Sequence, residues 1–135
     1  MKVGEVQKEP LMFALGFEYT REDIFREVGG SKVACLPTVD GTVVAACLLK
    51  KLSPQAPAVV LCGQGKRTSP TSWAFAQQTG ALPVFIKIAA RRWQYQGCFS
   101  VKRSYSSGPE FERLIAGSGR SLASVSYVVL LEPIK

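Results

Sequence analysis

Histidine is absent from the 135 residues of the sequence. Without an imidazole, the chain cannot build the Ser-His or Cys-His pairs of hydrolases, a histidine general base, or most catalytic zinc sites. Carboxylates are missing from a long central stretch, because residues 41–109 hold nine basic side chains and no acidic one. Paired carboxylates for acid–base catalysis therefore have no place there. We expect no catalytic residues, no metal site and no cofactor in this chain.

The sequence also lacks the C-x-x-C spacing of zinc ribbons and redox motifs. Its four cysteines lie far apart and mostly within apolar runs, which predicts buried thiols in a reducing compartment. They are Cys35, Cys47, Cys62 and Cys98. No run approaches the roughly 20 apolar residues that cross a bilayer, and the short LMFALGF stretch lacks a cleavage pattern after it. We therefore expect a cytoplasmic protein with no membrane partner.

What the sequence does have is a net charge of +7, and all of the excess lies in the middle of the chain. Residues 1–40 hold five basic and seven acidic side chains, and residues 110–135 hold three of each. The nine central cations have no carboxylate near them in sequence, which favours a surface that binds a polyanion. They are Lys50, Lys51, Lys66, Arg67, Lys87, Arg91, Arg92, Lys102 and Arg103.

Three helices are predicted from their end signals. The first follows a Thr20 cap, with Asp23 completing a short capping box, and stops at Gly29. The second has Ser69 as cap and Pro70 at its first position, with Gly80 just past its end, and the third lies between Pro109 and Gly117.

Strands fill most of the remaining sequence. A hairpin around Asp40-Gly41 is predicted in KVACLPTVDGTVVAACLL, and a buried strand in AVVLCG. A second hairpin is predicted over residues 82–103, and a last strand in SLASVSYVVLLEP. The order α-β-β-β-α-β-β-α-β differs from the strict alternation of a parallel doubly wound sheet. We predict a single α+β domain over residues 1–135, with a mixed, mostly antiparallel curved sheet or pseudo-barrel and about three short helices.

The second hairpin, LPVFIKIAARRWQYQGCFSVKR, carries two arginines at its turn and a row of alternating aromatic residues. In a regular strand Trp93, Tyr95, Phe99 and Val101 share one face. Phe99 fits the core, whereas Trp93 and Tyr95 fit either the core or a rim where a base could stack. Gly97 indicates a bulge or a close backbone approach.

The loop GQGKR invites comparison with nucleotide-binding P-loops. The full pattern would need glycine at position 60 and Ser or Thr at position 67, and Val60 and Arg67 fail both requirements. The loop could still hold a nucleic-acid phosphate. Asp40 is explained by its turn.

Four blocks together resemble the SRA-like modified-DNA readers of the PUA-like superfamily, found beside nucleases in bacterial restriction systems. The blocks are FEYTREDIFREVGGS, ACLPTVDGTVVAACL, APAVVLCGQG and LPVFIKIAARRWQYQGCFSVKR, within residues 17–103. The resemblance matches Tyr19 and Arg21 to a helix-start block and Tyr95 and Gly97 to a closing strand. It implies a curved sheet that cradles a nucleotide flipped from the duplex, with basic loops on the phosphates.

The first hypothesis is therefore a non-enzymatic nucleic-acid reader, with DNA favoured over RNA and a nuclease as a candidate partner. Cations would contact phosphates, and Trp93 or Tyr95 would stack on an exposed base. The candidate contact residues are Tyr19, Arg21, Lys66, Arg67, Arg91, Arg92, Trp93, Tyr95, Lys102 and Arg103.

Two alternatives stay open at this point. One is a protein-interaction or effector module whose basic hairpin edge pairs with a partner strand. The other is a small-molecule or nucleotide-modifying enzyme that uses a Cys62 thiolate near Lys66 and Arg67. The sequence does not identify the modified base.

Overall fold

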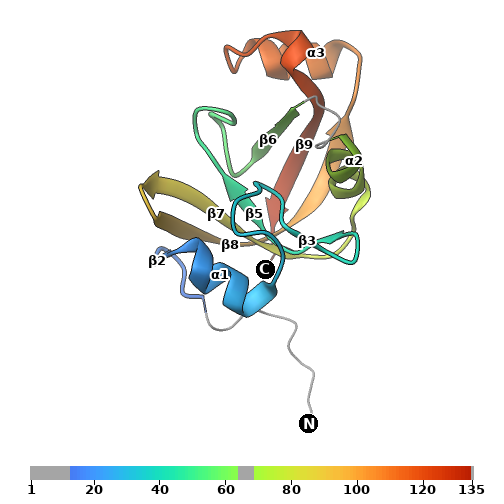
Figure 1. Ribbon diagram of the computed structural model, residues 1–135. Helices are drawn as coiled ribbons and strands as arrows, with labels where there is room; N and C mark the ends of the chain where they lie inside the picture. Colours follow the sequence, from blue (N-terminus) through green and yellow to red (C-terminus); the bar gives the residue numbers. More distant parts are fainter. Residues whose placement is uncertain (1–12, 64–68, 135) are drawn as a thin grey trace.

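The computed structural model describes residues 13–63 and 69–134, which form a main sheet and a small two-stranded sheet with helices around them (Figure 1). In chain order the elements are β2 (Glu18–Tyr19), α1 (Arg21–Val28), β3 (Thr38–Val39), β4 (Thr42–Val43), β5 (Ala46–Leu48), β6 (Val59–Gly63), α2 (Ser69–Gln77), β7 (Leu82–Ala89), β8 (Arg92–Tyr105), α3 (Pro109–Ala116), a 3-10 turn η1 (Leu122–Ser124) and β9 (Val125–Pro133). Figure 1 shows α1 and α3 at opposite ends of the sheet, with α2 at its side.

The main sheet has six strands in the order β5-β7-β8-β9-β6, with β2 added to β8. Every pairing is antiparallel except β5 with β7, which is parallel. The prediction of an α+β fold with a mixed, mostly antiparallel sheet and three helices is confirmed. Within the described residues the outer strands β5 and β6 do not pair with each other, so the sheet does not close into a barrel.

Helix α1 follows its sequence signals closely. The Thr20 hydroxyl accepts from the Asp23 amide at 3.1 Å, and the Asp23 carboxylate accepts from the Thr20 amide at 3.0 Å. This reciprocal pair is the predicted capping box, and the helix ends before Gly29, whose φ is +83°. Ile24 is the buried residue of this helix, which places one turn of α1 against the sheet.

The other two helices confirm their predicted positions with small shifts. Helix α2 starts at Ser69, one residue before the predicted first position, and ends at Gln77, three residues before Gly80. Helix α3 spans Pro109–Ala116, and the Gly117 amide donates to Arg113 at its end. It buries Phe111 and Ile115.

The first hairpin is shorter than predicted. Asp40 and Gly41 have positive φ angles of 51° and 81°, which is the conformation of a two-residue hairpin turn. Only two residues pair on each side of this turn, and the following residues 46–48 leave the hairpin as the separate strand β5. Strand β5 instead pairs with the distant β7, because Ala46, Cys47 and Leu48 are all buried and need cover on both faces.

The β7–β8 hairpin contains a bulge that divides its aromatic residues. Val84 pairs with Gly97 and Phe85 pairs with Tyr95, so Gln96 is an extra residue in β8. A one-residue insertion moves the following side chains to the other face of the sheet. The bulge predicted at Gly97 is confirmed, but the prediction that Tyr95 and Phe99 share one face is wrong.

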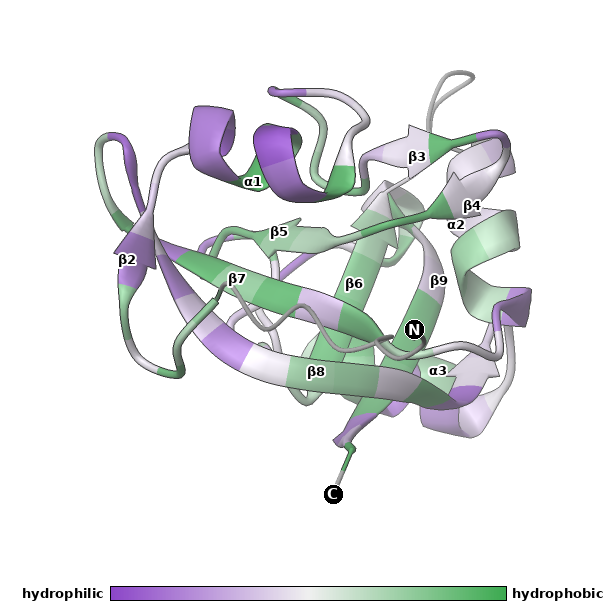
Figure 2. Cartoon of the chain, turned by 90° about the horizontal axis from the view of Figure 1, so that it is seen from below, coloured by the Kyte–Doolittle hydropathy of each residue, from purple (hydrophilic) through white to green (hydrophobic). Residues whose placement is uncertain are grey.

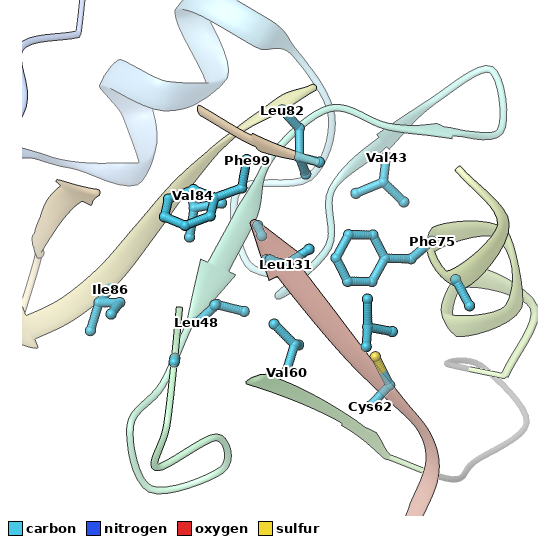
Figure 3. Close-up of a cluster of buried hydrophobic side chains, with 14 residues drawn as sticks. Val43, Leu48, Val60, Cys62, Phe75, Leu82, Val84, Ile86, Phe99 and Leu131 are labelled. Carbon is cyan, nitrogen blue, oxygen red and sulfur yellow. The ribbon is translucent and has the colours of Figure 1, made fainter. Parts of the chain in front are cut away.

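Hydrophobic side chains accordingly pack on both faces of the sheet. In Figure 2 the strands β5, β6, β7 and β9 are coloured mostly as hydrophobic, whereas α1 is largely hydrophilic. The largest cluster includes Phe99 and lies between the sheet and α2, where Phe75 points toward Val43 and Leu131 (Figure 3). Trp93 and Tyr95 belong to a second cluster with Phe85 near α1. The third cluster lies under α3. Among the described helices, none has the length and apolar character needed to cross a membrane.

Candidate nucleic-acid interface and pocket

A pocket with a volume of about 470 Å³ lies at the edge strand β6. Five separate segments line it: the loop after α1, the end of β5 with the loop after it, β6 itself, the start of α2, and Arg120 beyond α3. The lining residues are Ala34, Cys35, Leu36, Leu48, Leu49, Leu52, Ser53, Val60, Leu61, Cys62, Gly63, Thr71, Ser72 and Arg120. Aliphatic side chains dominate this wall, with hydroxyl, thiol and guanidinium groups between them. This composition suits a small, mainly apolar ligand that is oriented by a few hydrogen bonds.

Arg120 and Ser53 hold the pocket wall by bonding to backbone groups of the edge strand. The Arg120 guanidinium donates to the carbonyl oxygens of Leu52, Leu61 and Ser124 at 3.1, 3.3 and 2.9 Å. The buried Ser53 hydroxyl accepts from the Leu61 amide at 2.9 Å. These bonds occupy both backbone groups of Leu61 that face away from β9, so the edge strand does not offer them to another chain.

Two thiols line the same pocket, and their environments argue against an activated nucleophile. Cys62 is only 5% exposed, and burial raises the pKa of its thiol to about 12, although a hydrogen bond with Ser72 works in the opposite direction. Partial desolvation of the Cys35 thiol also raises its pKa, although the residue as a whole is exposed, while the Arg21 charge opposes that shift. A nucleophilic cysteine needs a lowered pKa. The described surroundings of Cys62 therefore give no support to the hypothesis of a Cys62 thiolate enzyme, whose other two residues, Lys66 and Arg67, lie outside the described residues.

The expectation of buried cysteines holds for two of the four. Cys47 and Cys62 are buried, Cys98 is half-buried and Cys35 is exposed in the loop after α1. Cys35 differs because it lies in a loop rather than in a buried strand.

The two aromatic residues predicted to stack on a base lie in the core. Trp93 and Tyr95 are each 7% exposed. The Tyr95 ring packs against Phe13 and Phe85 at centroid distances of 5.5 and 5.3 Å. Because protein covers both rings, we assign them to the core and assign no base contact to them.

Tyr19 and Arg21 lie beside this aromatic cluster. The Tyr19 ring meets Phe13 edge to face at 5.1 Å, and its hydroxyl accepts from the Ala14 amide at 2.7 Å. Arg21 lies over the Trp93 ring, with its Cζ atom 5.3 Å from the ring centroid. Both side chains are thus engaged by neighbouring protein groups.

The turn of the β7–β8 hairpin presents cations, but one of them is already paired. Arg91 is exposed in the turn with a positive φ of 61°. Arg92 makes a two-pronged ion pair with Glu18 of β2, with its Nε 2.7 Å and its Nη2 3.1 Å from the carboxylate oxygens. The Arg92 guanidinium lowers the pKa of Glu18. The Lys87 ammonium lies 5.7 Å from the Trp93 ring centroid.

Two of the remaining predicted cations lie away from this turn. Lys102 and Arg103 are exposed near the far end of β8, about 30 Å along the strand from Arg92 at the usual rise per residue. Lys66 and Arg67 lie outside the described residues. Within the described residues the cations therefore form at least two separate groups.

The backbone edge that the protein-interaction alternative requires is largely occupied. Strand β2 pairs with Trp93 and Gln94 of β8, and β5 pairs with Val84–Ile86 of β7.

The pocket and Arg120, which holds its wall, could not be predicted from the sequence, because the segments that form the pocket meet only in the folded chain. The apolar run of β6 was the one sequence feature that indicated part of the pocket wall.

Comparison with known proteins gives matches among solved structures. No protein-family model matches the chain, and no curated protein sequence does. The crystal structure of the SUVH5 SRA domain in complex with hemimethylated CG DNA matches with a TM-score of 0.58 and 12% identity, over 99% of this chain and 94% of that chain. The type IV phosphorothioation-dependent restriction endonuclease ScoMcrA matches with a TM-score of 0.50 and 18% identity, over 90% of this chain.

The match to ScoMcrA covers 24% of the endonuclease chain, so the present chain corresponds to about a quarter of that enzyme. At these identities the likeness concerns the fold. Together with the open mixed sheet and its three helices, it shows that this chain has an SRA-like α+β fold.

Proposed function

We propose that this chain binds nucleic acid without catalysis, as a reader of a modified base in DNA. The observation that carries the proposal is the pocket of about 470 Å³ at β6 in a chain with an SRA-like fold. The two structural neighbours support it, because one is an SRA domain bound to hemimethylated DNA and the other a phosphorothioation-dependent restriction endonuclease. The second neighbour also supports a nuclease as the partner.

In this proposal the pocket receives a base flipped out of the duplex. Flipping costs a few kcal/mol, and contacts inside the pocket must offset that cost. The aliphatic wall supplies apolar contact through Leu36, Leu49 and Val60, and Thr71 and Ser72 supply hydroxyl groups that can bond to a base edge. Its volume lies within the usual range of about 300–1,000 Å³ for ligand pockets.

Exposed cations contact the phosphates in the same proposal. Arg91, Arg92, Lys102 and Arg103 are exposed among the described residues, and Lys66 and Arg67 keep the role predicted for them from the sequence. Phosphate contacts fix the orientation of the protein on the duplex but carry no sequence information. Discrimination of the modified base is therefore assigned to the pocket.

The proposal is tested with matched duplexes that differ in one cytosine or adenine modification or in a backbone phosphorothioate, alongside single-stranded DNA and RNA, at two salt concentrations. We expect preference for one modified duplex. Replacing both Arg91 and Arg92 by alanine should flatten the slope of log K against log salt by about 0.9 for each phosphate that is no longer neutralised. Equal binding to all duplexes would contradict the proposal that this chain reads a modified base. Absence of binding, with a protein partner recovered after nuclease treatment, would replace it with the protein-interaction alternative.

A pocket-filling variant links the preference to the site. Leu52 lines the pocket and is 39% exposed, so Leu52→Trp can narrow the opening without entering the core. We expect this variant to lose the preference for the modified duplex and to keep salt-sensitive binding. Leu122→Trp is the matched control, since Leu122 is also exposed but lies outside the pocket lining.

A further inference from the structure

One wall of the pocket is the loop between α1 and β3, which contributes Ala34, Cys35 and Leu36. Part of this loop is held by its own residues, since the Ser31 hydroxyl accepts from the Val33 and Ala34 amides at 3.0 and 2.9 Å. Its far side is tied to β5, where the Cys47 amide donates to the Cys35 carbonyl at 2.7 Å. A loop of this kind keeps its shape only while such bonds persist.

A charged side chain outside this loop also bonds to it: that of Arg21, the first residue of α1. Its Nη2 atom donates to the carbonyl oxygens of Ser31 and Ala34, both at 2.8 Å. These distances are typical of bonds from a charged donor, which are stronger than neutral ones. The bonds connect the start of α1 to two points of the loop, ten and thirteen residues further along the chain.

The arginine itself is held from the other side by the hairpin core. Its guanidinium lies 5.3 Å from the centroid of the buried Trp93 ring, within the range of a cation–π contact. Its Nε is buried and has no hydrogen-bond partner among the described groups. The guanidinium thus has its Cζ atom over an aromatic ring and its Nη2 atom bonded to the loop.

From these contacts we infer that Arg21 and Trp93 form a bracket that positions the Ala34–Leu36 wall of the pocket, and that Arg21 acts as a positioning residue and not as a phosphate contact. The inference rests on the proposed function only in its DNA-binding readout. The sequence indicated Arg21 and Trp93 as candidate nucleic-acid contacts, and both residues are here given a role in positioning the pocket wall instead. Lysine does not reproduce this bracket, because its ammonium is a compact, strongly hydrated point charge without the delocalised plane by which arginine interacts with an aromatic ring.

Hydrogen exchange tests the bracket without any ligand. In Arg21→Lys we expect the amides of Val33, Ala34 and Cys47 to exchange at least about tenfold faster than in the unmodified protein, because removal of two charge-assisted bonds favours local opening. The amides of β9 are the internal reference and should keep their rates. Arg26→Lys is the matched control, since Arg26 lies on the same helix and is exposed in a single ion pair with Asp23. Unchanged loop exchange in Arg21→Lys would overturn the bracket.

A second variant keeps the test decisive if Arg21→Lys also accelerates β9 exchange, which would indicate global destabilisation. Trp93→Phe keeps Arg21 and an aromatic core residue but presents a smaller ring face to the guanidinium. We expect the same three loop amides to exchange faster, by a smaller factor, with β9 unchanged. No acceleration in this variant would exclude Trp93 from the bracket.

The salt dependence of duplex binding separates positioning from phosphate contact. For Arg21→Lys and Arg21→Gln we expect affinity for the preferred duplex to fall by a similar factor at every salt concentration, with an unchanged slope. A slope that flattens by about 0.9 in Arg21→Gln would make Arg21 a phosphate contact and overturn the inference. If the unmodified protein binds no duplex, the proposed function fails, and the exchange result still decides the bracket.

Discussion

At the scale of single residues, Arg120 shows how one side chain joins segments that are far apart in the sequence. Its guanidinium bonds to carbonyl oxygens of Leu52, Leu61 and Ser124, and so ties the loop after β5, the edge strand β6 and the turn before β9 together. Carbonyl groups at such a junction would otherwise lack partners or depend on water. Arg120 therefore contributes to stability as well as to the pocket wall.

Replacing Arg120 by alanine should lower the free energy of unfolding by about 2–3 kcal/mol, because hydrogen bonds from a charged group are each worth about 1.5–3 kcal/mol and the site is partly solvated. Urea denaturation measures the change. Arg103→Ala is the control, since Arg103 is exposed on β8 and its replacement should change stability by less than about 0.5 kcal/mol. Equal effects of the two substitutions would show that the Arg120 bonds add no net stability.

At the scale of elements, the bulge in β8 determines which side chains reach which core. Because Gln96 is an extra residue, Trp93 and Tyr95 face the cluster beside α1, while Phe99 faces the cluster beside α2. A single strand thereby supplies both faces of the sheet with large aromatic residues. The same bulge keeps Trp93 in the position where Arg21 lies over its ring.

Gly97→Ala should destabilise the protein by about 1–3 kcal/mol, because Gly97 has a φ of +108°, a conformation that is strained for residues with a Cβ atom. An added Cβ would lie 3.6 Å from the Leu15 side chain and 3.9 Å from Phe99, which is ordinary contact, so the backbone alone causes the destabilisation. Thermal and urea unfolding measure it.

Gly80→Ala is the control for this prediction. Gly80 has no atom within 4 Å of an added Cβ and does not have a positive φ. Its replacement should leave stability unchanged or slightly higher, since alanine restricts the unfolded chain. A Gly97 variant as stable as the Gly80 variant would show that the bulge tolerates a side chain.

At the scale of the whole molecule, the acidic N-terminal part neutralises some of the cations around it. The described ion pairs of this part join Glu22 to Lys32, Asp23 to Arg26, and Glu18 to Arg92. The last pair crosses from the acidic part to the basic central stretch. The positive surface is therefore smaller at the hairpin turn than the sequence block suggests, because Glu18 neutralises the exposed Arg92 there.

The Glu18–Arg92 pair predicts a specific pH dependence. Its hydrogen bond lowers the pKa of Glu18 below the ordinary value of 4.5, so the pair's contribution to stability is present above that value and is lost as the pH falls through the lowered pKa. In Arg92→Gln we expect the pKa of Glu18 to rise toward its ordinary value, as measured by NMR titration of the side-chain carboxyl.

High salt provides the control for this pair. Both groups are exposed, so about 1 M salt should shrink the pKa difference between the unmodified protein and Arg92→Gln. An unchanged Glu18 titration in Arg92→Gln would show that the ion pair does not persist in solution.

The sequence by itself determined the elements whose signals are local. The Thr20–Asp23 box, the Asp40-Gly41 turn and the Gly97 bulge each depend on a few neighbouring residues, so their chemistry could be read without the fold. The α+β class followed from the order of these elements. The resemblance over residues 17–103 indicated the SRA-like fold that the solved structures support.

Only the tertiary structure decided which residues could meet a ligand. The pocket draws on five segments, and Arg92 finds its carboxylate 74 residues away, so no local pattern could reveal either. One extra residue in β8 separated the faces of Tyr95 and Phe99, and packing against α1 and β7 covered Trp93. Burial and long-range pairing depend on where distant segments meet, and that is fixed by the packing of the whole chain.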